Sequence, residues 1–183
     1  MKHLFAHDLV LEPLVGEHAN EMFGLLQDSR IYEFIPDEPP ESLKSLEERY
    51  RFLEGAKSPD RKEHWLNWVI FLSQTRQPIR TVQATVRPGD TADIAYIILP
   101  EHWDKRFGRS ATAAMLDFIF EEFALKKAVA NVDTRNARSI RMLDALQFRQ
   151  VSRLKDADFF KGASSDEFVY EMEAERWMAL RER

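Results

Sequence analysis

The chain contains no cysteine. That absence excludes thiol nucleophiles, disulfide frameworks, iron–sulfur clusters and thiolate zinc sites. An excess of positive charge is also missing, because 26 Lys and Arg residues stand against 31 Asp and Glu residues, for a net charge of −5. This sign disfavours a protein whose main work is to neutralise phosphate backbones. We therefore expect no nucleic-acid partner.

Long apolar runs are absent as well. The longest, Trp68 to Leu72 and Ile94 to Pro100, are far shorter than the ~20 residues that span a bilayer. The first fifteen residues are interrupted by polar and charged side chains such as Lys2 and Asp8, so they do not form a secretion signal. These features predict a cytoplasmic protein that does not enter the membrane.

Length and composition indicate one domain over residues 1–183. With 183 residues, 44% of them hydrophobic, the chain can bury a core without help from disulfides or a structural metal. His3 and His7 are four residues apart, but no helical pattern surrounds them. We therefore expect no metal site.

The hydropathy pattern predicts a mixed α/β fold. Three segments rich in β-branched and aromatic residues follow one another across turn signals, which is typical of an antiparallel meander. Helical and strand-like segments alternate after them. The expected strands are 9–13, 65–74, 79–87, 92–99, 128–132 and 168–172, and the expected helices start near Ala19, Leu43, Arg109 and Asn136.

The order strand, helix, strand between residues 92 and 132 has a topological consequence. Such a crossover joins parallel strands, so the strands ending at Leu99 and Val132 should be parallel neighbours that splay apart. A ligand is expected where their carboxyl ends meet.

Two sequence blocks carry a family resemblance. Residues 94–111 read IAYIILPEHWDKRFGRSA, and residues 133–148 read DTRNARSIRMLDALQF. At their observed spacing they resemble the acetyl-CoA-binding motif and the following helix of the GNAT superfamily of N-acetyltransferases. The branch that acetylates the N-termini of ribosomal proteins is the most similar. The opening strand, the loop Phe34-Ile35-Pro36 and the strand that begins at Trp65 also match, so the resemblance covers nearly the whole chain.

The resemblance implies a mostly antiparallel central sheet flanked by helices, with one parallel, splayed strand pair. It also implies acetyl-CoA as cosubstrate, an amine as acceptor and no metal, and it leaves a homodimer open. The pyrophosphate would lie at a helix N-terminus, where unpaired N–H groups point outward. The implied cofactor-binding residues are Ile98, Leu99, Trp103, Asp104, Lys105, Arg106, Phe107, Gly108, Arg109 and Asn136.

Four glycines of the family pattern are replaced in this chain. Asp104 and Arg106 stand in the phosphate loop, Arg80 in an earlier strand, and Gln147 before Phe148. Glycine usually serves such positions because it adopts positive φ and lets the backbone approach a ligand. The replacements leave two interpretations open: weakened CoA binding, or a phosphate site that also uses arginine and lysine side chains. We expect acetyl-CoA to bind more weakly here than in relatives with an intact glycine loop.

Amine acetylation needs a proton for the departing thiolate. Many relatives supply it from a tyrosine, but Leu143 stands at that position, and the resemblance assigns the role to Ser139. The alternative for Ser139 is a helix N-terminal residue capped by Asn136. Asp93 matches a carboxylate that receives the amine proton in relatives, and its alternative is a solvated residue at a strand start.

The acceptor is not fixed by the sequence. Phe34 and Trp65 predict a partly apolar substrate pocket, and the acidic residues Glu33, Asp37 and Glu38 predict attraction for a cation. The preferred function is an acetyl-CoA-dependent transferase acting on a protein N-terminus or a small amine. The alternative is a binding module of the same fold whose altered loop no longer holds CoA.

Overall fold

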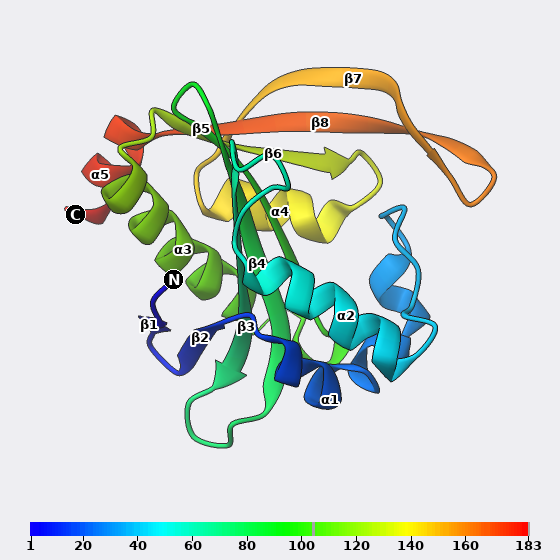
Figure 1. The fold of residues 1–183 in the computed structure, drawn as a ribbon. Helices are drawn as coiled ribbons and strands as arrows, with labels where there is room; N and C mark the ends of the chain where they lie inside the picture. Colours follow the sequence, from blue (N-terminus) through cyan, green and yellow to red (C-terminus); the bar gives the residue numbers. More distant parts are fainter. Residues whose placement is uncertain (104, 183) are drawn as a thin grey trace.

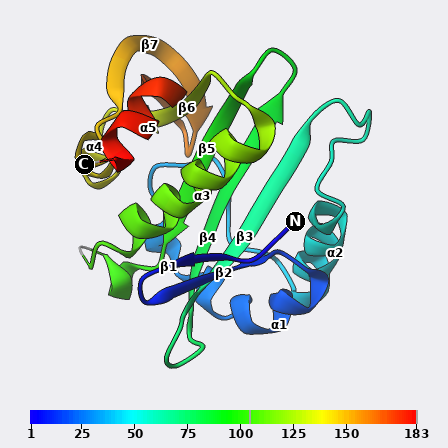
Figure 2. The ribbon, with the colours of Figure 1, turned by 90° about the vertical axis from the view of Figure 1, so that its left-hand side faces the viewer.

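The computed structural model describes residues 1–103 and 105–182. Eight strands form one sheet in the order β1-β2-β3-β4-β5-β6-β8-β7, with helices on both of its faces (Figures 1 and 2). The strands are β1 (Leu4–Ala6), β2 (Leu9–Pro13), β3 (His64–Leu72), β4 (Pro78–Arg87), β5 (Thr91–Ile98), β6 (Lys127–Asp133), β7 (Arg149–Phe160) and β8 (Ala163–Glu173). The helices are α1 (Ala19–Met22), α2 (Leu43–Glu54), α3 (Phe107–Phe123), α4 (Ala137–Ala145) and α5 (Ala174–Arg181).

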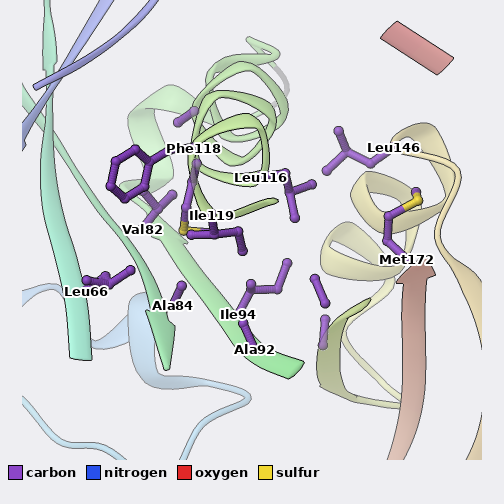
Figure 3. Packing of buried hydrophobic residues seen from close by; sticks show 14 of the residues in the cluster. Leu66, Val82, Ala84, Ala92, Ile94, Leu116, Phe118, Ile119, Leu146 and Met172 are labelled. Carbon is purple, nitrogen blue, oxygen red and sulfur yellow. The ribbon is translucent and has the colours of Figure 1, made fainter. Parts of the chain in front are cut away.

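The alternation of side chains along β3 explains the layers. Trp68 and Ile70 belong to the core beneath α3, whereas their neighbours Val69 and Phe71 pack with α1 and α2 on the opposite face. Successive strand residues point to opposite faces, so a run that is buried throughout needs cover on both sides. The core beneath α3 also includes Val82, Ile94 and Ile119 (Figure 3).

The expected parallel pair is confirmed. Strand β5 pairs with β6 in parallel through three residue pairs, from Thr91 with Lys127 to Asp93 with Val129. The pairing stops there, although β5 continues to Ile98 and β6 to Asp133. All the other neighbouring strands in the sheet are antiparallel. The two strands therefore diverge toward their carboxyl ends.

Several elements were not predicted correctly. The expected first helix is broken, because α1 stops at Met22 and a 3-10 turn follows at Leu25–Gln27. Strand β7 is not among the expected strands, and the closing strand begins at Ala163 rather than at residue 168. Every residue of β7 before Asp158 is exposed, so its sequence lacks the apolar alternation that identifies a half-buried strand. Strand β1 and helix α5 were also missed.

Gln147 lies at the end of α4 in the left-handed region, with φ of 63°. The N–H of Phe148 bonds to the carbonyl of Leu143 at 3.0 Å, and that of Gln147 bonds to Asp144 at 2.9 Å. This pair of bonds is the Schellman motif, in which glycine is the usual left-handed residue. The chain thus keeps the backbone of the family glycine while carrying a side chain there.

We predict that Gln147→Gly stabilises the protein by about 1 kcal/mol. A Cβ in the left-handed region costs ~1–2 kcal/mol, and the greater freedom of glycine in the unfolded chain offsets part of that gain. Urea unfolding should give a higher midpoint with an unchanged slope. The control Gln147→Ala keeps the Cβ, so an equal gain from alanine would contradict the explanation.

Candidate active site

Two cavities meet where β5 and β6 diverge. One has a volume of about 350 Å³ and lies against the starts of α3 and α4. The other has about 280 Å³ and lies between the diverging strands and the β7–β8 hairpin. The residues that line both are Phe34, Ile35, Tyr96, Ile97, Asn136 and Ser139. A ligand in one cavity can therefore reach a ligand in the other at these side chains.

The larger cavity contains the N-terminus of α3. Arg106 precedes the helix with φ of 64° and ψ of 0°, and its own side chain makes no hydrogen bond that caps the helix. Positive φ is a conformation that glycine adopts at least cost, so Arg106 has a backbone conformation that would suit the family glycine. Uncapped N–H groups at a helix start bind anions.

Gly108 lets this helix start approach its neighbours closely. A Cβ at this position would lie 3.0 Å from Sδ of Met142 on α4 and 3.2 Å from Cγ1 of Ile98 on β5. A larger residue would require these two side chains to shift by a few tenths of an ångström. Gly108 therefore allows close packing of α3 against β5 and α4 beside the cavity.

The larger cavity is strongly basic although the chain as a whole is acidic. Among the residues that the structure describes, its lining includes five arginines and one carboxylate, Glu33; the arginines are Arg30, Arg106, Arg109, Arg138 and Arg141. Arginine forks match the geometry of phosphate oxygens. The cavity therefore suits a ligand that carries several negative charges.

Arg138 is held in place by an aromatic ring. Its guanidinium carbon lies 3.5 Å from the centre of the Trp103 ring, and the indole is fixed by a 2.8 Å hydrogen bond from its Nε1 to the carbonyl of Ile98. Nε of Arg138 is buried and has no hydrogen-bond partner in the described part of the chain. A buried N–H of a charged group without an acceptor is costly, so this atom indicates an anionic ligand.

His102 is a second buried group that faces this cavity. Its side chain is 6% exposed, and neither ring nitrogen bonds to a described residue. Burial and then the charge of Lys105 lower its pKa, although Glu101 opposes them. The imidazole is therefore neutral near pH 7 and can donate one hydrogen bond.

Ser139 projects from the first turn of α4 to the junction of the cavities. The Asn136 side chain caps the helix by accepting a 3.1 Å bond from the Ser139 N–H. The Ser139 hydroxyl takes no part in that cap and instead lies 2.6 Å from the Tyr96 hydroxyl. Asn136 is thus the cap, as expected, and Ser139 keeps a hydroxyl in the site.

The smaller cavity is acidic. Its lining contains Asp37, Asp133, Asp158 and Glu167 against a single arginine, Arg49. Asp133 is 5% exposed and is satisfied by Arg135 at 2.5 Å and by Ser165 at 2.7 Å. Burial opposes ionisation, but the bonds from Arg135 and Ser165 prevail and lower the pKa of Asp133.

Glu167 faces the smaller cavity from β8, in register with Asp133 on β6. Burial, then the charge of Asp158, raises the pKa of Glu167, and Asp133 adds to the effect while Asn131 opposes it. A nearby cation would stabilise the ionised form of such a carboxyl group and lower its pKa. The smaller cavity therefore suits a positively charged group.

The smaller cavity is covered by contacts between distant segments. Lys161, at the tip of the β7–β8 hairpin, donates hydrogen bonds to the carbonyls of Tyr32 and Ile35. These bonds link the hairpin to the loop that carries Phe34. Two segments that are far apart in the sequence, and that both contribute to the lining of the smaller cavity, are thus joined to each other.

A family model described as an acetyltransferase (GNAT) domain matches residues 8–149. The chain belongs to the GNAT acetyltransferases. It is 23% identical over 164 residues to an uncharacterized N-acetyltransferase, YoaA, of Bacillus subtilis, covering 88% of this chain and 91% of that protein. It is 21% identical over 174 residues to the uncharacterized N-acetyltransferase p20 of Bacillus licheniformis, covering 94% and 96%.

Solved structures of this family have the same fold. A GNAT acetyltransferase from Bacillus anthracis superposes with a TM-score of 0.82 at 18% identity, covering 95% of this chain and 99% of that one. A spermidine N-acetyltransferase from Vibrio cholerae, solved with CoA and spermine, gives 0.79 at 23% identity, covering 94% and 99%. The expected superfamily and fold are thus confirmed.

The structure brings most of the expected cofactor residues together. Ile98, Trp103, Arg106, Phe107, Gly108, Arg109 and Asn136 line the larger cavity. Leu99 does not; it is 2% exposed and packs with Ile31 and Tyr32. Lys105 is exposed outside the cavity lining, and Asp104 lies outside the described residues.

Two expected site residues lie elsewhere. Asp93 lines neither cavity and forms an ion pair with Arg87. It lies in the last β5–β6 residue pair, before the strands diverge. Trp65 also lines neither cavity; its indole bonds to Glu63 at 2.8 Å and packs on Phe52. Trp65 lies on the face of β3 that packs against α2, away from both cavities.

Sequence reasoning missed Tyr96, Arg138 and Glu167. Tyr96 was treated as part of an apolar strand, and Arg138 occupies a position that the family motif leaves free. Glu167 reaches the site only because β8 pairs with β6 over a long sequence separation. The alternation of β5 and the helical spacing from Asn136 could have placed the first two on the correct faces.

We predict that Arg138→Met weakens acetyl-CoA binding by ~10- to 100-fold, because a charge-assisted hydrogen bond contributes ~1.5–3 kcal/mol. Pantetheine lacks the phosphates, so its affinity should not change. Calorimetric titration of both ligands checks this. Arg149→Met, which removes an exposed arginine outside the cavities, is the control. An equal loss for pantetheine would contradict a phosphate contact.

Proposed function

We propose that this acetyltransferase moves the acetyl group of acetyl-CoA to a primary amine, either a protein N-terminus or a small amine. The observation that carries the proposal is the position of Ser139, at the junction of an arginine-lined and a carboxylate-lined cavity. A polyanionic donor and a cationic acceptor have opposite charges, and the two cavities match them. Members of the family use acetyl-CoA, and the similar structure from Vibrio cholerae was solved with CoA and spermine.

The residues of the larger cavity fit CoA. The start of α3, the left-handed Arg106 and the Nε of Arg138, which bonds to no described residue, would hold the phosphates, and Asn136 would contact the pantetheine arm. Acetyl-CoA supplies the acetyl group in an activated thioester. The alternative of a binding module with a failed loop is less well supported, because Arg106 has the positive φ that glycine usually supplies and its side chain lines the cavity.

In the proposed reaction the ammonium group of the acceptor first loses a proton to water. The neutral amine nitrogen then forms a bond to the acetyl carbon, and the carbon–sulfur bond breaks with its electron pair going to sulfur. Ser139 gives its hydroxyl proton to the sulfur and recovers one from solvent. The nitrogen releases one proton to Glu167 or to water in the smaller cavity. One proton is gained by sulfur and one is lost by nitrogen, so the step balances.

The acidic lining of the smaller cavity supports an acceptor that carries a second positive charge. A polyamine and a peptide with a basic residue near its N-terminus both have this property. A screen of polyamines, monoamines and N-terminal peptides, with free CoA thiol as the readout, tests the proposal. Failure of the protein to bind acetyl-CoA in a calorimetric titration would overturn it.

We predict that Ser139→Ala lowers turnover by ~10²–10⁴-fold, the usual loss for an acid–base group, without changing acetyl-CoA affinity. The matched control is Ser45→Ala. Ser45 occupies the same third position of α2 but bonds within its helix cap. We expect Ser45→Ala to lower the melting temperature and keep turnover. We expect Ser139→Ala to lower turnover and keep the melting temperature. Full turnover by Ser139→Ala would reduce Ser139 to a structural role.

We predict that Glu167→Gln raises the KM for the amine about tenfold, which corresponds to ~1.4 kcal/mol of lost attraction. In the native protein the same KM should rise as pH falls through the raised pKa of Glu167, because the neutral carboxyl no longer attracts the amine. The variant should lose this pH dependence. The control Glu173→Gln removes an exposed carboxylate of the same strand.

Stability gives an independent readout for Glu167. A carboxyl whose pKa is raised by folding stabilises the native state only at low pH, and that contribution is lost as pH rises through the raised value. At neutral pH the ionised Glu167 therefore opposes folding. Glu167→Gln should unfold at the same or a higher temperature, so a loss of stability together with the higher KM would indicate a structural defect.

A further inference from the structure

Tyr96 places a phenol hydroxyl at the point where the two cavities join. Its Oη lies 2.6 Å from Oγ of Ser139 and 3.3 Å from the carbonyl of Ser139. The residue lines both cavities. This contact joins the middle of β5 to the first turn of α4, and 43 residues separate the two partners in sequence.

The divergence of the sheet creates this contact. Strand β5 pairs with β4 along its whole length, and Tyr96 is opposite Val82 there. On its other edge β5 is paired with β6 only as far as Asp93. Side chains alternate along β5, so Ile94, Tyr96 and Ile98 share the face of the core beneath α3. From that face the long tyrosine side chain reaches α4.

The hydrogens of the pair allow two arrangements. Each hydroxyl has one hydrogen to donate. In the first arrangement Tyr96 donates to Oγ of Ser139, which leaves the serine hydrogen free to point into the site. In the second, Ser139 donates to Tyr96, and Tyr96 donates to the more distant carbonyl. Only the first arrangement offers a hydrogen to a ligand.

We propose that Tyr96 is a positioning residue that donates its hydrogen bond to Ser139 and thereby directs the serine hydrogen toward the CoA sulfur. This inference rests on the proposed function, because it concerns the same thioester. Tyr96 does not transfer its own proton. As Ser139 gives up its proton to sulfur, negative charge develops on Oγ, and the hydrogen bond from Tyr96 stabilises that charge.

The surroundings of Tyr96 support a donor that stays protonated. Burial of the phenol raises its pKa above the ordinary value, although the bond to Ser139 opposes this change. A phenol with a raised pKa remains a hydrogen-bond donor at every pH at which the enzyme would work. Tyr96 is therefore not expected to add an ionisation to the pH profile.

A buried tyrosine hydroxyl usually finds a partner for structural reasons alone. The test must therefore measure something that a purely structural bond would leave unchanged. The thiol of bound CoA offers such a probe, because a hydrogen bond from Ser139 favours its thiolate form. The thiolate is measured by its ultraviolet absorbance in a pH titration of the protein saturated with CoA, and no acceptor is needed.

We expect Ser139→Ala to reduce the thiolate fraction of bound CoA at mildly alkaline pH about tenfold, the effect of one charge-assisted hydrogen bond. Tyr96→Phe keeps the ring and removes only the hydroxyl, and we expect a reduction of several-fold. In the Ser139→Ala background, Tyr96→Phe should have no further effect, because Tyr96 acts through Ser139. The control is Tyr50→Phe, a buried tyrosine of α2 outside both cavities.

The outcomes separate this inference from the proposed function. If the native protein does not bind CoA, the proposed function fails and this inference fails with it. If CoA binds but Tyr96→Phe gives the thiolate fraction of the native protein, only the role of Tyr96 is overturned. An increase in the thiolate fraction in Tyr96→Phe would also overturn it, since that result means that Tyr96 had been accepting the serine hydrogen in the native protein.

A second variant guards against a folding defect in Tyr96→Phe. Replacing Tyr96 by 3-fluorotyrosine keeps the ring and hydroxyl and makes the phenol a stronger donor. We expect it to raise the thiolate fraction, and a fall would contradict the proposal. With an acceptor from the amine screen, Tyr96→Phe should lower kcat about tenfold and leave the KM for acetyl-CoA unchanged. If the double variant loses as much kcat as the product of the two single losses, Tyr96 does not act through Ser139.

Discussion

The short parallel pairing of β5 and β6 is the constraint on which the site depends. Only three residue pairs join these strands, and beyond them the strands diverge. Backbone groups on a strand edge need partners, so the free edge of β5 is suited to an extended ligand. The divergence also makes room for the cavity between the strands and lets Tyr96 reach α4 rather than a neighbouring strand. If the ladder continued to Ile98, β6 would close the junction that Ser139 now occupies.

Charge is separated across this junction in a way that the net charge conceals. The chain carries a net −5, yet arginines dominate the lining of one cavity and carboxylates that of the other. A phosphate-bearing donor and an amine would therefore each be drawn to one side, with the hydroxyl of Ser139 between them. Each cavity also holds a charged group that lacks a partner of opposite charge among the described residues. Nε of Arg138 lacks an acceptor, and Glu167 is held with a raised pKa beside other carboxylates. Both would be relieved by a ligand of opposite charge.

The sequence predicted the part of the fold in which local pattern and tertiary environment agree. Strands β3 to β6 and helices α2 to α4 have clear periodicity, and the motif around Gly108 and Asn136 placed the site. Strand β7 was missed because an exposed hairpin shows no apolar alternation. Glu167 was missed because its position follows from β6–β8 pairing rather than from nearby residues. Asp93 and Trp65 lie outside both cavities for the opposite reason: their residue types fitted the chemistry, but Asp93 precedes the divergence of the strands and Trp65 faces α2.

The replaced glycines show what such a motif constrains physically. Arg106 and Gln147 stand where the family has glycine, and both adopt positive φ, at 64° and 63°. The chain has therefore kept the backbone conformation and given up the residue that adopts it at least cost. That cost of ~1–2 kcal/mol for each residue is borne in folding, because the conformation is already present before a ligand binds. At Arg106 the side chain also adds a positive charge to the larger cavity. A glycine in a motif therefore marks a backbone conformation, and residues with side chains can adopt that conformation at a cost in folding free energy.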